Sequence, residues 1–162
     1  MKNLETVFNI KGVISWVARN EHGVIFAQGG HSLDLGEHNQ VQKLATDSII
    51  DTLQTVGTDL KDIDAMRIGA GSGVGWTGAA LNSNSSVELS TGSEWTESQP
   101  TSGVARVVVT FTNVAETITE AGLFSDGAGL AELLFYDDTT ISVTLQATDS
   151  LQVTWDVSAG SN

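Results

Sequence analysis

The chain has 162 residues, which suits one domain with a substantial hydrophobic core. Lys and Arg number 7 and Asp and Glu number 20, so the formal net charge is −13, which disfavours binding to nucleic acid or to an anionic membrane surface. The absence of cysteine excludes disulfides, thiolate metal sites and a cysteine nucleophile.

The N-terminal part is predicted to form a β-hairpin followed by a helix. Apolar and polar residues alternate over residues 6–19, which is the pattern of a half-buried strand, and a turn signal at 20–23 followed by residues 24–28 predicts the returning strand of a hairpin over 6–28. Over residues 39–57 apolar residues recur at helical spacing. Asn39 is a suitable N-cap and Gly57 lies where a C-terminal glycine is favoured, so one α-helix is expected there.

The rest of the chain is predicted to consist of strands. A short strand over 64–69 leads into a glycine-rich segment, and the polar stretch 77–102 holds one strand near 86–90. Over 103–158 short alternating runs are separated by turn residues, a spacing typical of sandwiches and barrels. We therefore expect a single, mainly β domain over 1–162: an antiparallel β-sandwich of the jelly-roll-like type with one α-helix.

One of these runs, residues 130–136, bears on whether the chain forms an oligomer. Residues 130–136 are apolar on both faces, which is typical of a central strand that needs cover on both sides. The single helix can cover only one patch, so a neighbouring copy in a closed oligomer is expected to cover the other. The alternative is that segment 77–102 folds over that face and the chain is a monomer.

Neither of two possible ligand-binding segments matches a known pattern. The glycine run at 69–75 lacks both the third glycine of a dinucleotide fingerprint and the Gly-Lys-Ser/Thr of a P-loop, so it is interpreted as a turn between strands. Four possible metal ligands lie within 31–38, but their spacing matches no zinc pattern: His31, Asp34, Glu37 and His38. We therefore expect no metal and no cofactor.

Two acid pairs have the residue types of glycosidase carboxylates, Asp137-Asp138 and Glu94 with Glu97. On a chain this acidic, paired acids usually form a solvated face. We expect that the protein is not an enzyme, and a small carbohydrate-active enzyme is only the third hypothesis.

The four tryptophans fall into two groups. Trp16 and Trp155 lie on the apolar faces of predicted strands, which indicates core packing. Trp76 and Trp95 lie in predicted loops rich in glycine and serine, where an exposed indole suits a protein interface or a sugar platform. The alternative is that each folds back over the core. Trp76 and Trp95 are the candidate partner-binding residues.

The order of these segments, with two short motifs, resembles virion proteins of tailed viruses, including viruses of halophilic archaea. The most specific pieces are Glu-Ala-Gly-Leu-Phe at 120–124 and the ending Asp-Ser-Leu-Gln-Val-Thr-Trp at 149–155. The resemblance implies a β-sandwich virion component, a homotrimer, of the capsid decoration type (cement, turret or head fibre). Such a protein binds the major capsid protein at the capsid surface, and no catalytic residues come with the resemblance.

Related domains also occur in tail fibres and baseplates, so a tail component that binds the host surface or a sugar is the alternative. The chain has no long repetitive shaft, which favours the compact capsid-binding type. No stretch is apolar over the roughly 18 residues of a membrane span, and the first residues lack a signal-peptide core. We therefore expect synthesis in the host cytoplasm. The net charge of −13 with few lysines also suggests adaptation to high salt, which would screen self-repulsion.

Overall fold

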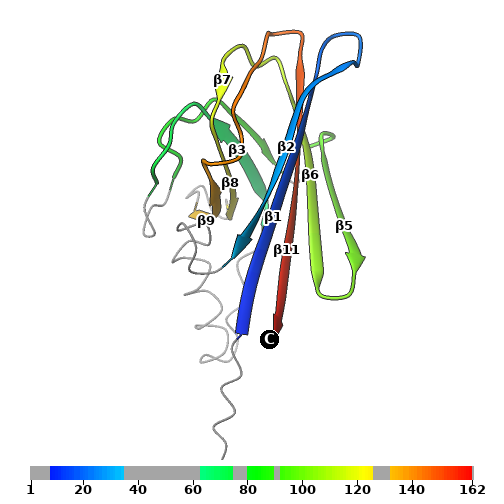
Figure 1. The fold of residues 1–162 in the computed structure, drawn as a ribbon, viewed down its shortest axis with the longest axis vertical. Helices are drawn as coiled ribbons and strands as arrows, with labels where there is room; N and C mark the ends of the chain where they lie inside the picture. The colour runs from blue at the N-terminus through cyan, green and yellow to red at the C-terminus, as the bar shows by residue number, and fades with distance from the viewer. Residues whose placement is uncertain (1–7, 35–62, 75–79, 90–91, 126–131, 162) are drawn as a thin grey trace, which may run out of the picture.

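The computed structural model describes residues 8–34, 63–74, 80–89, 92–125 and 132–161, and these form strands and their connections (Figure 1). The predicted helix over 39–57 lies outside the described residues. Within the described ranges no helix is long and apolar enough to cross a membrane. In chain order the strands are β1 (Phe8–Arg19), β2 (Ile25–Asp34), β3 (Ala65–Gly69), β4 (Ser86–Leu89), β5 (Trp95–Thr101), β6 (Val104–Thr112), β7 (Thr117–Ile118), β8 (Glu120–Ser125), β9 (Glu132–Asp137), β10 (Val143–Thr144) and β11 (Ser150–Ser161).

The larger sheet has five strands in the order β2-β1-β11-β6-β5, and every neighbouring pair is antiparallel. Its central strand β11 pairs Trp155 with Ile14 of β1 and with Val107 of β6. The three side chains therefore lie in one row on the same face. All three are buried, as the alternation of apolar and polar residues in these strands predicts.

The smaller sheet has four strands in the order β4-β3-β8-β9, also antiparallel, and β7 and β10 form a separate short pair. The predicted strands near 64–69 and 86–90 are confirmed as β3 and β4. The expectation of a central strand at 130–136 is wrong, because β9 lies at the edge of this sheet as the described strands form it.

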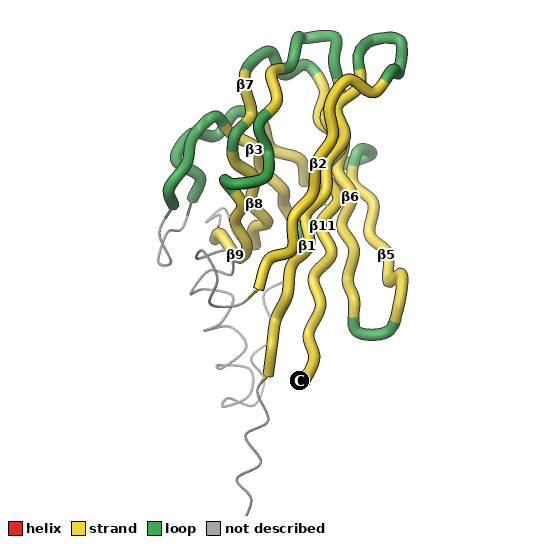
Figure 2. Tube along the Cα trace, viewed as in Figure 1, coloured by secondary structure: helices red, strands yellow, loops and turns green. Residues whose placement is uncertain are grey.

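The two sheets pack face to face around one core (Figure 2). Both sheets contribute to the same apolar cluster, and the Phe135 ring of β9 lies 6.5 Å from the Trp155 ring of β11, between centroids. The large, fully buried side chains of this cluster include Ile14, Met66, Ile68, Phe111, Ile118, Leu123, Ile141 and Trp155. The predicted antiparallel β-sandwich is confirmed.

The outer face of the smaller sheet carries a second apolar cluster. It consists of Ala65, Val74, Phe124, Leu133 and Tyr136, with Leu81 packed against it. Val74 and Leu81 belong to the connection between β3 and β4, so the chain itself contributes cover to the face for which a neighbouring copy was expected. The double-sided burial of β9 therefore gives no evidence for an oligomer.

Candidate interaction surface and buried carboxylates

The turn of the β1–β2 hairpin is stabilised by the Asn20 side chain and by backbone hydrogen bonds. The Asn20 side-chain oxygen accepts hydrogen bonds from the backbone N–H groups of His22 and Val24, each at 3.0 Å. The Asn20 backbone N–H donates to the Val24 carbonyl at 3.0 Å, and Gly23 N–H donates to the Asn20 carbonyl at 2.9 Å. Gly23 has φ +76°, which glycine adopts without strain. The predicted turn is confirmed, and asparagine and glycine provide its specific chemistry.

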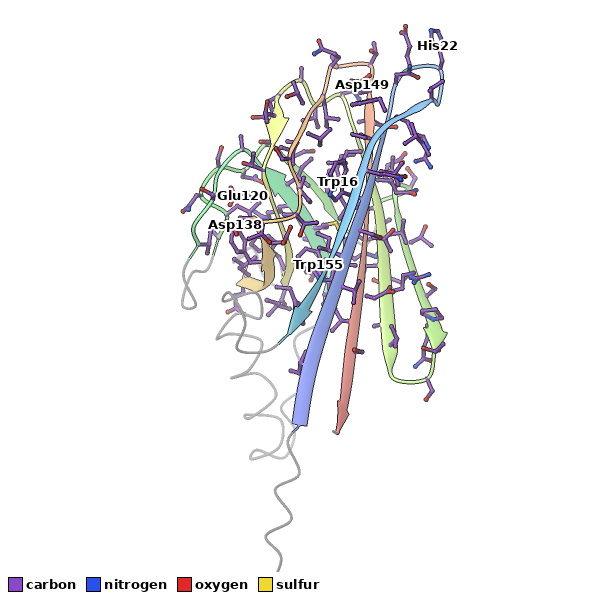
Figure 3. The ribbon with its side chains drawn as sticks, viewed as in Figure 1. Trp16, His22, Glu120, Asp138, Asp149 and Trp155 are labelled. Carbon is purple, nitrogen blue, oxygen red and sulfur yellow. The ribbon has the colours of Figure 1, made fainter. Side chains whose placement is uncertain are left out.

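Directly after this turn three consecutive apolar residues are exposed. The exposed fractions are 58% for Val24, 48% for Ile25 and 47% for Phe26, and we call these residues the apical strip. The β1–β2 register shifts here, since Ala18 pairs with Ala27 and Arg19 pairs with Ile25, which leaves Phe26 without an opposite residue. The turn lies at one extreme of the molecule, where Figure 3 labels His22. The apical strip is the candidate interaction surface, because adjacent exposed apolar side chains are typical of contact sites.

The outer face of the smaller sheet contains a fully buried carboxylate, that of Glu120. Glu120 of β8 has no exposed surface, and its Oε1 accepts hydrogen bonds from the backbone N–H groups of Ser83 at 2.8 Å and Gly71 at 3.1 Å. Its Oε2 accepts from the Tyr136 hydroxyl at 3.0 Å and from Asn82 N–H at 3.4 Å. A buried carboxylate with this many donors is well satisfied, and it ties the β3–β4 connection to β8 and β9.

Gly69, the last residue of β3, and Gly71, just after it, are required by this close packing. A Cβ atom on Gly69 would lie 1.6 Å from the Ser83 carbonyl oxygen, and one on Gly71 would lie 2.5 Å from Glu120 Oε1. The Thr119 hydroxyl donates to the Gly71 carbonyl at 2.8 Å and holds the same segment from the other side. The predicted turn between strands is confirmed for 69–74, and its glycines allow the backbone to approach a carboxylate of the chain itself.

Tyr136 of β9 extends the cluster. Its hydroxyl accepts a hydrogen bond from Val74 N–H at 3.4 Å while donating to Glu120. Burial raises the pKa of this phenol strongly, and the neighbouring Glu120 carboxylate adds to the rise, although the Val74 N–H opposes it. Asp138 accepts from Gly73 N–H at 2.6 Å at the rim of the cluster, and Figure 3 shows Glu120 and Asp138 on the same side of the molecule.

Asp137, the last residue of β9, provides a second buried carboxylate. It has no exposed surface, and it accepts hydrogen bonds from the hydroxyls of Thr139 and Thr140, both at 3.1 Å, and from Thr140 N–H at 3.2 Å. The Thr140 carbonyl in turn accepts from the Trp16 indole N–H at 3.1 Å, which links the two sheets. The expected solvated face is therefore wrong for Asp137.

The other acid pair, Glu94 and Glu97, is exposed, as expected for a solvated face. Glu97 also accepts a hydrogen bond from the Trp95 indole at 2.7 Å. In the described part of the chain, no three His, Cys, Asp or Glu side chains come close enough together to hold a metal ion. The candidate ligands at 31–38 lie outside the residues whose side chains the structure describes.

The tryptophan predictions have different outcomes. Trp16 and Trp155 are buried in the core, which confirms the prediction (Figure 3). The loop position predicted for Trp95 is wrong: Trp95 begins β5, is 8% exposed and belongs to the main core cluster, as the alternative of folding over the core anticipated. Trp76 lies outside the described residues.

Sequence reasoning missed the two buried carboxylates. Glu120 lies in a strand where every residue is buried, and an acid within such an apolar run was the signal that could have identified it. The apical strip was also missed, because Val24 and Phe26 were interpreted as part of an ordinary returning strand.

Comparison with known proteins identifies no relative. No family model matches the chain, and neither the curated proteins nor the solved structures contain a significant match.

Proposed function

We propose that this chain is a structural virion protein of a tailed virus, which binds the major capsid protein at the capsid surface and stabilises the capsid as a decoration protein. The structural observation that supports the proposal is the apical strip, an exposed apolar surface on an acidic chain. The carboxylates of Glu120 and Asp137 accept hydrogen bonds from their own chain, so they hold the sandwich together. A decoration protein acts through its surface, and the apical strip is the candidate contact region on that surface.

The virion assignment itself comes from the resemblance of the sequence. The stretch at 120–124 lies in β8, and most of the stretch at 149–155 lies in β11, the central strand of the larger sheet. Both stretches supply residues to the main core. This placement supports a likeness in the framework of the fold.

The proposed mechanism is additive binding energy. A protein that binds the mature capsid lattice and does not bind the disassembled subunits stabilises the lattice by mass action. A rigid sandwich suits this role because little conformational entropy is lost when it binds.

The test is the amount of the chain in purified virions of the encoding virus, measured by quantitative mass spectrometry against the major capsid protein. The proposal expects a fixed, high ratio of the two proteins, and capsids stripped of the chain should disrupt at a lower temperature until it is added back. A handful of copies per particle would indicate the tail-fibre or baseplate alternative. Absence from virions would overturn both assignments.

A further inference from the structure

The two edge strands of the five-stranded sheet are built differently. The β5 edge carries the features that prevent pairing with another strand: Pro100 has no N–H group, the β5–β6 register is irregular between Ser98 and Thr101, and Glu97 adds a charge. The side chains of β5 after its first residue are exposed and polar or proline. This edge is protected against a further strand.

The β2 edge differs in composition, although its register with β1 also shifts, at Phe26. The strand is 10 residues long, and no charged residue occurs from Val24 to Gly30 in a chain whose net charge is −13. Within the described part of the chain only β1 pairs with β2, and no described strand lies against the other edge of β2, where backbone N–H and carbonyl groups can pair. The apical strip lies at the start of this edge.

We propose that the outer edge of β2 pairs with the same edge of a second copy of this chain, antiparallel and about a two-fold axis, so that two five-stranded sheets join into one. Two observations select a second copy. The protected β5 edge is a poor acceptor for β2, so a contact that joins two of the five-stranded sheets is the symmetric β2–β2 contact. The uncharged run from Val24 to Gly30 also lets two acidic chains approach without placing like charges opposite each other.

The geometry of the hairpin favours this contact. The Asn20 turn fixes the start of β2 before any partner arrives, so little ordering is required on pairing. Pairing would also cover apolar side chains that are about half exposed in the single chain. The inference does not depend on the capsid role, and it differs from the trimer that the resemblance to virion proteins implies.

The test is the mass of the purified full-length chain by light scattering and sedimentation equilibrium at micromolar concentration. Molar salt is used because two chains of charge −13 repel each other. The expected result is a dimer. A monomer or a trimer under these conditions would overturn the proposal.

Substitutions on the two edges locate the contact. Phe26→Lys should raise the dimer dissociation constant at least about tenfold, because a lysine on an edge strand opposes pairing. The matched control is Thr96→Lys, at an exposed position on the β5 edge, which makes the same change in net charge and should leave the dimer unchanged. An added positive charge alone should strengthen association of two acidic chains, so loss of the dimer in Phe26→Lys has to come from the edge.

Thermal unfolding of each variant checks that it folds. If Phe26→Lys unfolds, Val24→Lys replaces it, since Val24 is the most exposed residue of the strip and precedes β2. A dimer that survives whichever of these two substitutions folds, or that Thr96→Lys dissociates equally, would overturn the β2–β2 contact.

Discussion

The two sheets of the sandwich are stabilised on their outer faces in different ways. The five-stranded sheet buries one face, and the exposed or half-exposed side chains of β6 alternate with buried ones along the strand. The four-stranded sheet is buried on both faces in β8 and β9, and its outer face is covered by a connection held to Glu120 and Tyr136. The first sheet therefore depends on apolar burial and regular pairing, whereas the second also depends on a satisfied carboxylate.

The largest expected effect tests the shared core. Trp155→Ala removes a fully buried indole that contacts the Phe135 ring of the opposite sheet, and should destabilise the fold by about 3–5 kcal/mol. Chemical denaturation measures the free energy of unfolding. Val13→Ala on the exposed face of β1 is the control, and it should cost less than about 1 kcal/mol. Similar losses in both variants would contradict the assignment of Trp155 to the interior.

The second prediction separates the two sheets. Glu120→Gln keeps the size of the side chain but points an amide N–H₂ at groups that are themselves donors, so a loss of about 2–3 kcal/mol is expected. Hydrogen exchange should show Gly71 and Ser83 amides opening while the β1–β11 amides stay protected. Asp138→Asn is the matched control, because Asp138 is partly exposed and receives one described hydrogen bond, from Gly73. Uniform opening of both sheets would show that the carboxylate has no specific role in the smaller one.

The five-stranded sheet was largely predictable from the sequence. Alternation located β1, β6 and β11 because one face is apolar and the other is polar, so period two is visible in each. β5 was not predicted, since only Trp95 of its residues is buried and the others show no alternation. An edge strand with polar side chains on both faces carries no such signal.

The four-stranded sheet was less predictable. β9 has apolar residues on both faces, and pattern alone cannot distinguish burial between strands from burial under a connection. Val74 and Leu81 provide that connection here, and their contacts with Tyr136 and Leu133 are not local in sequence. The backbone N–H groups that donate to Glu120 belong to residues 37 to 49 positions away, and the Tyr136 hydroxyl is 16 positions away, so no spacing rule identifies these hydrogen bonds.

The third prediction uses the only tyrosine of the chain. Its pKa is raised in the folded state, so the folded chain keeps a phenolic proton that the unfolded chain releases above its ordinary pKa of about 10. The stability from this group is complete below about pH 10 and should decrease by about 1.4 kcal/mol per pH unit above it. Absorbance of tyrosinate reports the ionisation of Tyr136 directly, and it should coincide with unfolding.

Tyr136→Phe is the control for this pH dependence. The variant loses the hydrogen bond to Glu120 and should be about 1 kcal/mol less stable near neutral pH. It should also lose less stability than the parent between about pH 10 and 12, because no phenol remains to ionise. Tyrosinate formation at an ordinary pKa in a folded parent chain would show that the hydroxyl is solvated.

The smallest expected effect returns to the outer face of the larger sheet. Arg106 on β6 and Asp156 on β11 are directly opposite, and the guanidinium donates two hydrogen bonds of 2.6 Å to the carboxylate. This bidentate pair raises the pKa of Arg106, with the side-chain hydrogen bond as the main cause and the charge of Asp156 as the second. Both side chains are partly exposed, so water and salt screen the pair, and the coupling energy should be the least of the effects tested here.

A double-mutant cycle of Arg106→Ala and Asp156→Ala, measured in low and in molar salt, gives that coupling energy. Salt should decrease the coupling between these two residues, because it screens an exposed attractive pair. Over the same range it should raise the thermal midpoint of the parent chain, because it screens the repulsion of a net charge of −13. The two opposite responses separate local from global electrostatics. A midpoint that stays constant or falls with salt would contradict the high-salt adaptation inferred from composition, whatever the ion pair does.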